Sequence, residues 1–72
     1  MSVTVNWPKA ALNIRSAGMS LTNASRRIGR YPDFLARVAR GDQSRMYFDD
    51  GLKILDLHTD LCGAEKTAEL RQ

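Results

Sequence analysis

The sequence has 72 residues, of which 43% are hydrophobic and 26% are charged, as in an ordinary folded domain. A chain of this length builds one small hydrophobic core, so its composition and length argue against a multidomain machine, a disordered tail and a membrane protein. We therefore expect one folded domain over residues 1–72, in which residues 1–6 and 64–72 can fray.

Charge is distributed unevenly along the chain. Residues 1–45 contain eight basic and two acidic side chains, a net charge of +6, whereas residues 46–72 contain three basic and six acidic ones, a net charge of −3. Seven of the eight basic residues in the first part are arginines, whose planar guanidinium groups suit phosphate and guanine. Nucleic acid is therefore the first partner to test, although a solvated basic face gives the same composition.

The sequence offers no residues for catalysis or for metal binding. Cys62 is the only cysteine, which excludes an intrachain disulfide and a thiolate zinc cluster. His58 is the only histidine, and with no partner at metal-ligand spacing it is expected to be a packed or partly exposed side chain. Residues 1–6 carry neither a secretory signal nor a spanning segment. We expect a cytoplasmic protein with no metal, cofactor, small-molecule ligand or membrane contact, and not an enzyme.

Capping residues and glycines divide the chain into helix-length segments. The first predicted helix covers residues 7–17, with Asn6 as its N-cap and Gly18 at its end. The second begins after Ser20 and ends at Gly29. It is predicted to bury one face and to expose the other, and the residues of the buried face are Leu21, Ala24, Ser25 and Ile28.

A third helix is predicted between Pro32, which suits a first helical position, and Gly41. At 100° per residue this helix separates into two faces. Its core face contains Phe34, Leu35 and Val38, and its outward face contains Asp33, Ala36, Arg37 and Arg40.

The rest of the chain is predicted to form a loop and one strong helix. Residues 42–48 form the loop, in which Met46, Tyr47 and Phe48 are expected to anchor to the core. The helix follows at residues 50–61, and residues 64–72 are either a short fifth helix or a frayed tail. The predicted fold class is all-α, a compact bundle of four to five helices.

A helix, a glycine turn and a second helix with outward arginines are the parts of a helix-turn-helix. Leu21–Gly29 and Phe34–Gly41, with the interval from Gly29 to Gly41, resemble the lambda-repressor/Cro-like helix-turn-helix family of phage and bacterial regulators. The resemblance extends from Met19 to Leu61 and includes the segment Gly51-Leu52-Lys53-Ile54-Leu55 at the start of the next helix. Arg30 stands where an aliphatic residue is usual in that family.

The resemblance implies that the second helix enters the major groove of DNA. Arg37 and Arg40 then read bases, with help from Tyr31, Ala36 and Asp33. Three alternatives stay open: the two arginines form a solvated face with one intrahelical ion pair, Tyr31 packs on the preceding helix, and Asp33 stabilises the helix end or orients Arg37. The expected phosphate contacts are Thr22, Asn23, Arg26, Arg27, Arg30, Gln43 and Arg45.

The last strong helix carries more apolar residues than one packed face needs, and Ile54, Leu57 and Leu61 are expected to contact a second copy. The predicted function is a sequence-specific regulator of transcription that binds double-stranded DNA as a homodimer, a phage or prophage type of repressor acting by promoter occlusion. The alternative is a protein-interaction module, such as an antitoxin or anti-repressor, that uses the apolar face of this helix. RNA binding is a distant third.

Overall fold

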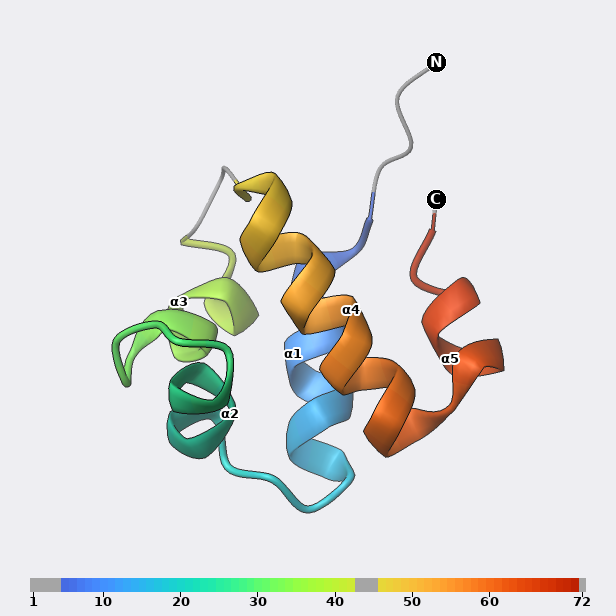
Figure 1. Ribbon diagram of the computed structural model, residues 1–72, viewed down its shortest axis with the longest axis horizontal. Helices are drawn as coiled ribbons and strands as arrows, with labels where there is room; N and C mark the ends of the chain where they lie inside the picture. The colour runs from blue at the N-terminus through green and yellow to red at the C-terminus, as the bar shows by residue number, and fades with distance from the viewer. Residues whose placement is uncertain (1–4, 43–45, 72) are drawn as a thin grey trace.

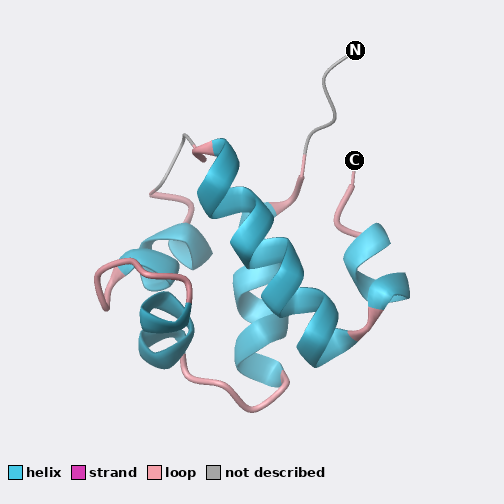
Figure 2. Cartoon of the chain, in the orientation of Figure 1, coloured by secondary structure: helices cyan, strands magenta, loops and turns pink. Residues whose placement is uncertain are grey.

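The computed structural model describes residues 5–42 and 46–71, and five helices make up most of these two ranges. In chain order they are α1 (Trp7–Ser16), α2 (Leu21–Arg27), α3 (Phe34–Arg40), α4 (Phe48–Cys62) and α5 (Ala64–Ala68) (Figure 1). Loops join the helices, and the described ranges contain no strand, only an isolated antiparallel bridge between Val5 and Arg71 (Figure 2). The predicted all-α class is therefore confirmed.

Helix α1 lies at the centre of the fold. It begins as predicted, because the Asn6 side chain accepts a hydrogen bond from the backbone N–H of Lys9 at 3.2 Å and Pro8 occupies the first turn. Its residues Ala10 and Ala11 are fully buried, and such small side chains permit close approach. Helices α3 and α4 both pack against α1.

The remaining helices surround this centre. Helices α2 and α3 lie to one side of the crossing of α1 and α4, and α5 lies to the other (Figure 1). The core is contiguous from one side to the other. Its largest fully buried apolar side chains come from four segments of the chain and are Phe34, Ile14, Leu35, Ile54 and Leu70.

The two ends of the described chain are fixed to each other. Between the two alternatives for residues 64–72, the structure shows a short helix, and Leu70 beyond it is fully buried in the core. The backbone N–H of Asn6 donates to the carbonyl oxygen of Leu70 at 2.8 Å. Residues 5–6 and 70–71 are therefore part of the packed structure.

Two helix starts differ from the prediction. Helix α3 begins at Phe34, because Pro32 and Asp33 form a turn that the N–H of Phe34 closes onto the carbonyl of Tyr31 at 3.1 Å. Helix α4 begins at Phe48, inside the segment predicted as a loop. Within residues 5–42 and 46–71, no helix combines the length and the apolar character that crossing a bilayer requires.

Candidate nucleic-acid interface

A tight turn connects α2 to α3. Gly29 adopts a φ of +79°, a left-handed conformation that costs glycine little and other residues more. In this conformation the N–H of Arg30 reaches the carbonyl of Ser25 at 2.9 Å, and the N–H of Gly29 reaches the carbonyl of Arg26 at 3.0 Å. These two bonds form the Schellman motif that ends many helices. The chain thus leaves α2 in a defined direction.

Ser25 joins α2 directly to the start of α3. The residue is fully buried, and its hydroxyl donates to the carbonyl of Leu21 at 2.7 Å and accepts from the backbone N–H of Leu35 at 2.9 Å. The Leu35 N–H is one of the first donors of α3, which have no partner within their own helix. Asp33 occupies the N-cap position but makes no capping bond with its side chain. Ser25 therefore caps α3 from a neighbouring helix and fixes its orientation.

Helix α3 has the two faces that its sequence predicts. Phe34, Leu35 and Val38 are buried. On the opposite face Asp33, Arg37 and Arg40 are exposed, and the small Ala36 between them is half-buried. The first turn of α3 is thus anchored in the core, and two guanidinium groups project from the outer face.

The two outer arginines are weakly engaged. The Nε of Arg40 lies 3.3 Å from Oδ2 of Asp42, and both side chains are more than half exposed, so this ion pair contributes little. The guanidinium of Arg37 lies 5.9 Å from the ring centroid of Tyr31. Among the described residues no ion pair joins Arg37 to Asp33. Both guanidinium groups remain available to a partner.

The ring of Tyr31 packs against the start of α3, and not against α2 as the alternative interpretation expected. Its ring packs edge-on against Phe34, with centroids 5.7 Å apart and planes at 81°. The residue nevertheless keeps 44% of its surface exposed. It lies directly before the turn that starts α3, next to the guanidinium of Arg37. An aromatic surface therefore lies beside one of the two outer arginines.

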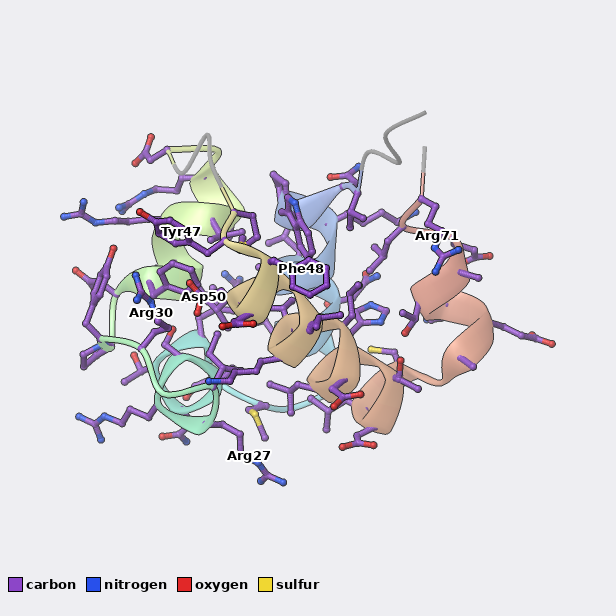
Figure 3. All side chains as sticks on the ribbon, turned by 45° about the horizontal axis from the view of Figure 1, so that its top comes forward. Arg27, Arg30, Tyr47, Phe48, Asp50 and Arg71 are labelled. Carbon is purple, nitrogen blue, oxygen red and sulfur yellow. The ribbon has the colours of Figure 1, made fainter. Side chains whose placement is uncertain are left out.

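Arg30 was expected to expose its guanidinium to phosphate, but its side chain packs inward. Its side chain is 35% exposed, and its Nε lies 3.6 Å from Oδ2 of the buried Asp50 in α4 (Figure 3). The guanidinium also lies 4.8 Å from the ring centroid of Phe34, in range of a cation–π contact. The Nε is buried and has no hydrogen-bond partner. Arg30 packs inward because a carboxylate from α4, far along the chain, lies under the turn.

The residues predicted to contact phosphate from α2 are exposed, but they are not all in one place. Thr22, Asn23, Arg26 and Arg27 have exposed side chains. Arg27 lines a shallow cleft against α4, together with the acidic residues Asp56 and Asp60 and with Lys53. In Figure 3 its side chain points away from the turn that carries Arg30. Gln43 and Arg45, the two further predicted contacts, lie outside the described residues.

The predicted dimer contacts on α4 are wrong in two of three positions. Ile54 and Leu57 are 1% and 5% exposed because α1 and the rest of the core cover them, and Leu61 is half-buried against the same core. The exposed apolar residues of α4 lie at its N-terminal end. Tyr47, Phe48 and Leu52 are 68%, 78% and 50% exposed, so the expectation that Tyr47 and Phe48 anchor to the core is also wrong.

The side chain of His58 is buried and hydrogen-bonded to two neighbouring side chains. His58 is fully buried; the Asn13 side-chain amide donates to its Nε2 at 3.1 Å, and its Nδ1 donates to the Thr67 hydroxyl at 2.7 Å. This arrangement describes a neutral ring. Burial, and secondarily the charge of Lys66, lowers the pKa of His58. His58 is therefore a packed residue, as expected.

The contacts of α2 and of the turn thus anchor α3, and α3 presents arginines on its outer face. In comparisons with known proteins, no family model matches the chain, and neither a curated protein nor a solved structure matches it.

Proposed function

We propose that the chain is a sequence-specific regulator that binds double-stranded DNA, with α2, the turn and α3 acting as a helix-turn-helix of the lambda-repressor/Cro-like type. One observation carries the proposal. Arg37 and Arg40 project from the exposed face of α3, and the opposite face of this helix is anchored in the core by Phe34 and Leu35. An anchored helix with exposed guanidinium groups suits base recognition, which requires side chains positioned within a fraction of an ångström.

The dimensions of α3 support this function. Seven residues give a helix about 10 Å long at 1.5 Å per residue, and the major groove of B-DNA is about 12 Å wide. Arg37 and Arg40 lie three positions apart and therefore on one side of the helix. In the proposed complex they donate bidentate hydrogen bonds to guanine, and the exposed part of Tyr31 contacts the backbone or a thymine methyl.

Helix α2 supplies contacts to the DNA backbone in this proposal. Thr22, Asn23 and Arg26 are exposed on it, and phosphate contacts of this kind fix the register of a protein on the duplex without reading sequence. Arg30 acts differently from a phosphate ligand. Its contacts with Asp50 and Phe34 orient the turn relative to α4.

The first experiment is selection of bound duplexes from a random pool, followed by affinity measurements on the selected duplex and on a random one. Arg37→Ala is expected to cost about 1–3 kcal/mol on the selected duplex and to relax its sequence preference. Arg26→Ala is expected to weaken binding to both duplexes alike and to lower the salt slope by about one unit.

Arg15 provides the matched control, because it is an exposed arginine at the end of α1, outside α2 and α3. Arg15→Ala is expected to leave both affinities nearly unchanged. If no duplex is enriched, or if Arg37→Ala and Arg15→Ala behave alike, base recognition by α3 is wrong.

A homodimer fits this function, because two α3 helices related by a twofold axis engage half-sites about one helical turn of DNA apart. A small domain bound across a promoter represses by occlusion. A palindromic consensus from the selection supports both points, and a consensus with one half-site only argues against the dimer.

A protein-interaction module is the second candidate, and the exposed rings of Tyr47 and Phe48 are the observation that favours it. Salt separates the two functions. DNA binding through several arginines weakens steeply from low to moderate salt, whereas an apolar protein interface responds little.

A further inference from the structure

The start of α4 carries an apolar surface that the monomer leaves open. We define the aromatic patch as Tyr47, Phe48 and Leu52, which are 68%, 78% and 50% exposed. These three residues line a groove of about 380 Å³, together with other residues that include Trp7 and Leu55. Figure 3 shows Tyr47 and Phe48 at the N-terminal end of α4. Single exposed apolar residues are common, but three exposed apolar residues that line one groove mark an interface.

The floor of this groove is built from a close helix contact. At Gly51 a Cβ atom would lie 3.0 Å from Cη2 and 3.3 Å from Cζ2 of Trp7, so the indole passes directly over the glycine. The shape of the groove therefore depends on the packing of α1 against α4.

We propose that a second copy of this chain covers the aromatic patch, with the two α4 helices antiparallel about a twofold axis near Gly51. This inference deepens the proposed function by naming the surface through which the dimer forms. The face carries both an apolar groove and the protruding ring of Phe48, as an interface between identical patches requires. Phe48 lies three residues before Gly51, which places it about 4.5 Å from the axis, measured along α4 at 1.5 Å per residue. Because the partner helix runs in the opposite direction, the ring of Phe48 then lies level with the interval between Leu52 and Leu55 of the partner.

Two charges of α4 lie at equal distances along the helix on either side of the proposed axis, and this symmetry favours a second copy as the occupant. Asp49 and Lys53 are exposed on α4, one helical turn apart. An axis near Gly51 places each Asp49 opposite Lys53 of the partner, so opposite charges meet on both sides of the axis. The other exposed charges of α4, Asp56 and Asp60, line the cleft against α2 and lie outside the groove at the aromatic patch.

The area of the patch also fits an interface between two copies. An aromatic side chain buries roughly 150–250 Å², so the two rings at their exposed fractions offer roughly 300 Å², and the half-exposed Leu52 adds to this apolar area. An interface of standard size buries about 800 Å² on each partner, of which somewhat more than half is apolar. The aromatic patch has the size of the apolar centre of such an interface.

The test measures the oligomeric state without DNA, by sedimentation over a dilution series. Leu52→Ser and Phe48→Ser are expected to raise the dissociation constant of the dimer at least thirtyfold. Leu12→Ser is the matched control: Leu12 is a leucine of nearly equal exposure, 46%, on α1, and its replacement is expected to leave the dimer intact. A chain that stays monomeric at 1 mM, or a control that dissociates like Leu52→Ser, overturns the proposal.

Two further experiments, a cysteine crosslink and a charge exchange, test the geometry of the dimer. In a Cys62→Ser background, Leu52→Cys is expected to form a covalent dimer on oxidation, whereas Leu12→Cys is not. Asp49→Lys and Lys53→Asp are each expected to weaken the dimer, and the double variant is expected to restore it. Oligomers that grow beyond two copies, or a double variant that is weaker than either single one, overturn the twofold arrangement.

The outcome is distinguishable from that of the proposed function. A chain that dimerises through the aromatic patch and binds no duplex retains this inference and refutes DNA binding. A chain that binds a selected duplex and is monomeric at 1 mM retains DNA binding and refutes this inference. A dimer that Phe48→Ser and Leu52→Ser leave intact forms through another surface, and this also refutes the inference.

Discussion

Ser25 is the residue at which the anchoring of α3 is most directly testable. Ser25→Ala removes the acceptor that now receives the backbone N–H of Leu35 at 2.9 Å, in a site with no exposed surface on the serine. The hydroxyl also loses its donation to the Leu21 carbonyl, but that carbonyl keeps its position in the first turn of α2. The principal loss is thus one buried donor left without a partner.

The size of the effect follows from two opposing contributions. An unpaired buried N–H costs about 1–3 kcal/mol. Alanine favours the helix over serine by about 0.5 kcal/mol, which offsets part of that cost. The expected net loss of folding free energy is about 1.5 kcal/mol, or a fall in Tm of about 6–12 °C for a domain of this size.

Urea denaturation of the wild type and of Ser25→Ala measures this loss as a shift of the midpoint at constant m. Hydrogen exchange of the Leu35 amide locates it, because that N–H is expected to exchange faster in the variant. Ser16→Ala is the control, since Ser16 is exposed at the end of α1, and it is expected to change stability by less than about 0.5 kcal/mol. If Ser25→Ala is as stable as the wild type and the Leu35 amide exchanges at its original rate, the serine does not cap α3.

Three more perturbations have outcomes that the structure fixes. The pKa of His58 is lowered from its ordinary 6.5, so its contribution to stability is complete above pH 6.5 and is lost as the pH falls through the folded pKa. The urea midpoint of the wild type should therefore decrease when the pH is lowered from 8 to 5.5, and His58→Gln should reduce this dependence of the midpoint on pH. Gly51→Ala places a methyl group 3.0 Å from the Trp7 ring and should cost about 1–2 kcal/mol despite better helix propensity, measured by thermal unfolding; an unchanged Tm contradicts the close contact. Asp50→Asn removes the carboxylate beside the half-exposed Arg30 and should cost about 1 kcal/mol, between the values for exposed and buried pairs; a denaturation midpoint equal to that of the wild type shows that the pair is without energetic weight.

Local sequence patterns predicted the starts of α1 and α2 and the ends of α2 and α3. Asn6 and Ser20 cap α1 and α2 by the side-chain bonds that such residues make, and Gly29 and Gly41 end α2 and α3 in the left-handed conformation. These features depend on residues within a few positions of each other. The two faces of α3 follow from the same local periodicity, so its exposed arginines were predictable.

The position of the apolar surplus on α4 was not predictable from local patterns. The periodicity indicates that this helix has more apolar residues than one face needs, but α1 decides which of them are covered. Ile54 and Leu57 face the core, whereas Phe48 and Leu52 remain exposed. The exposed pair was detectable only as an i, i+4 spacing in a segment that the sequence alone assigned partly to a loop.

The sequence by itself thus determined the all-α class, the caps of α1 and α2 and the outward face of α3, because these features arise from contacts between near neighbours in the chain. The tertiary structure decided the contacts between distant residues. Arg30 turns inward because Asp50, twenty positions later, lies beneath it, and Leu70 is fixed because Asn6 binds its carbonyl. Such contacts depend on how the helices pack, and local patterns do not specify the packing of helices that are far apart in the chain.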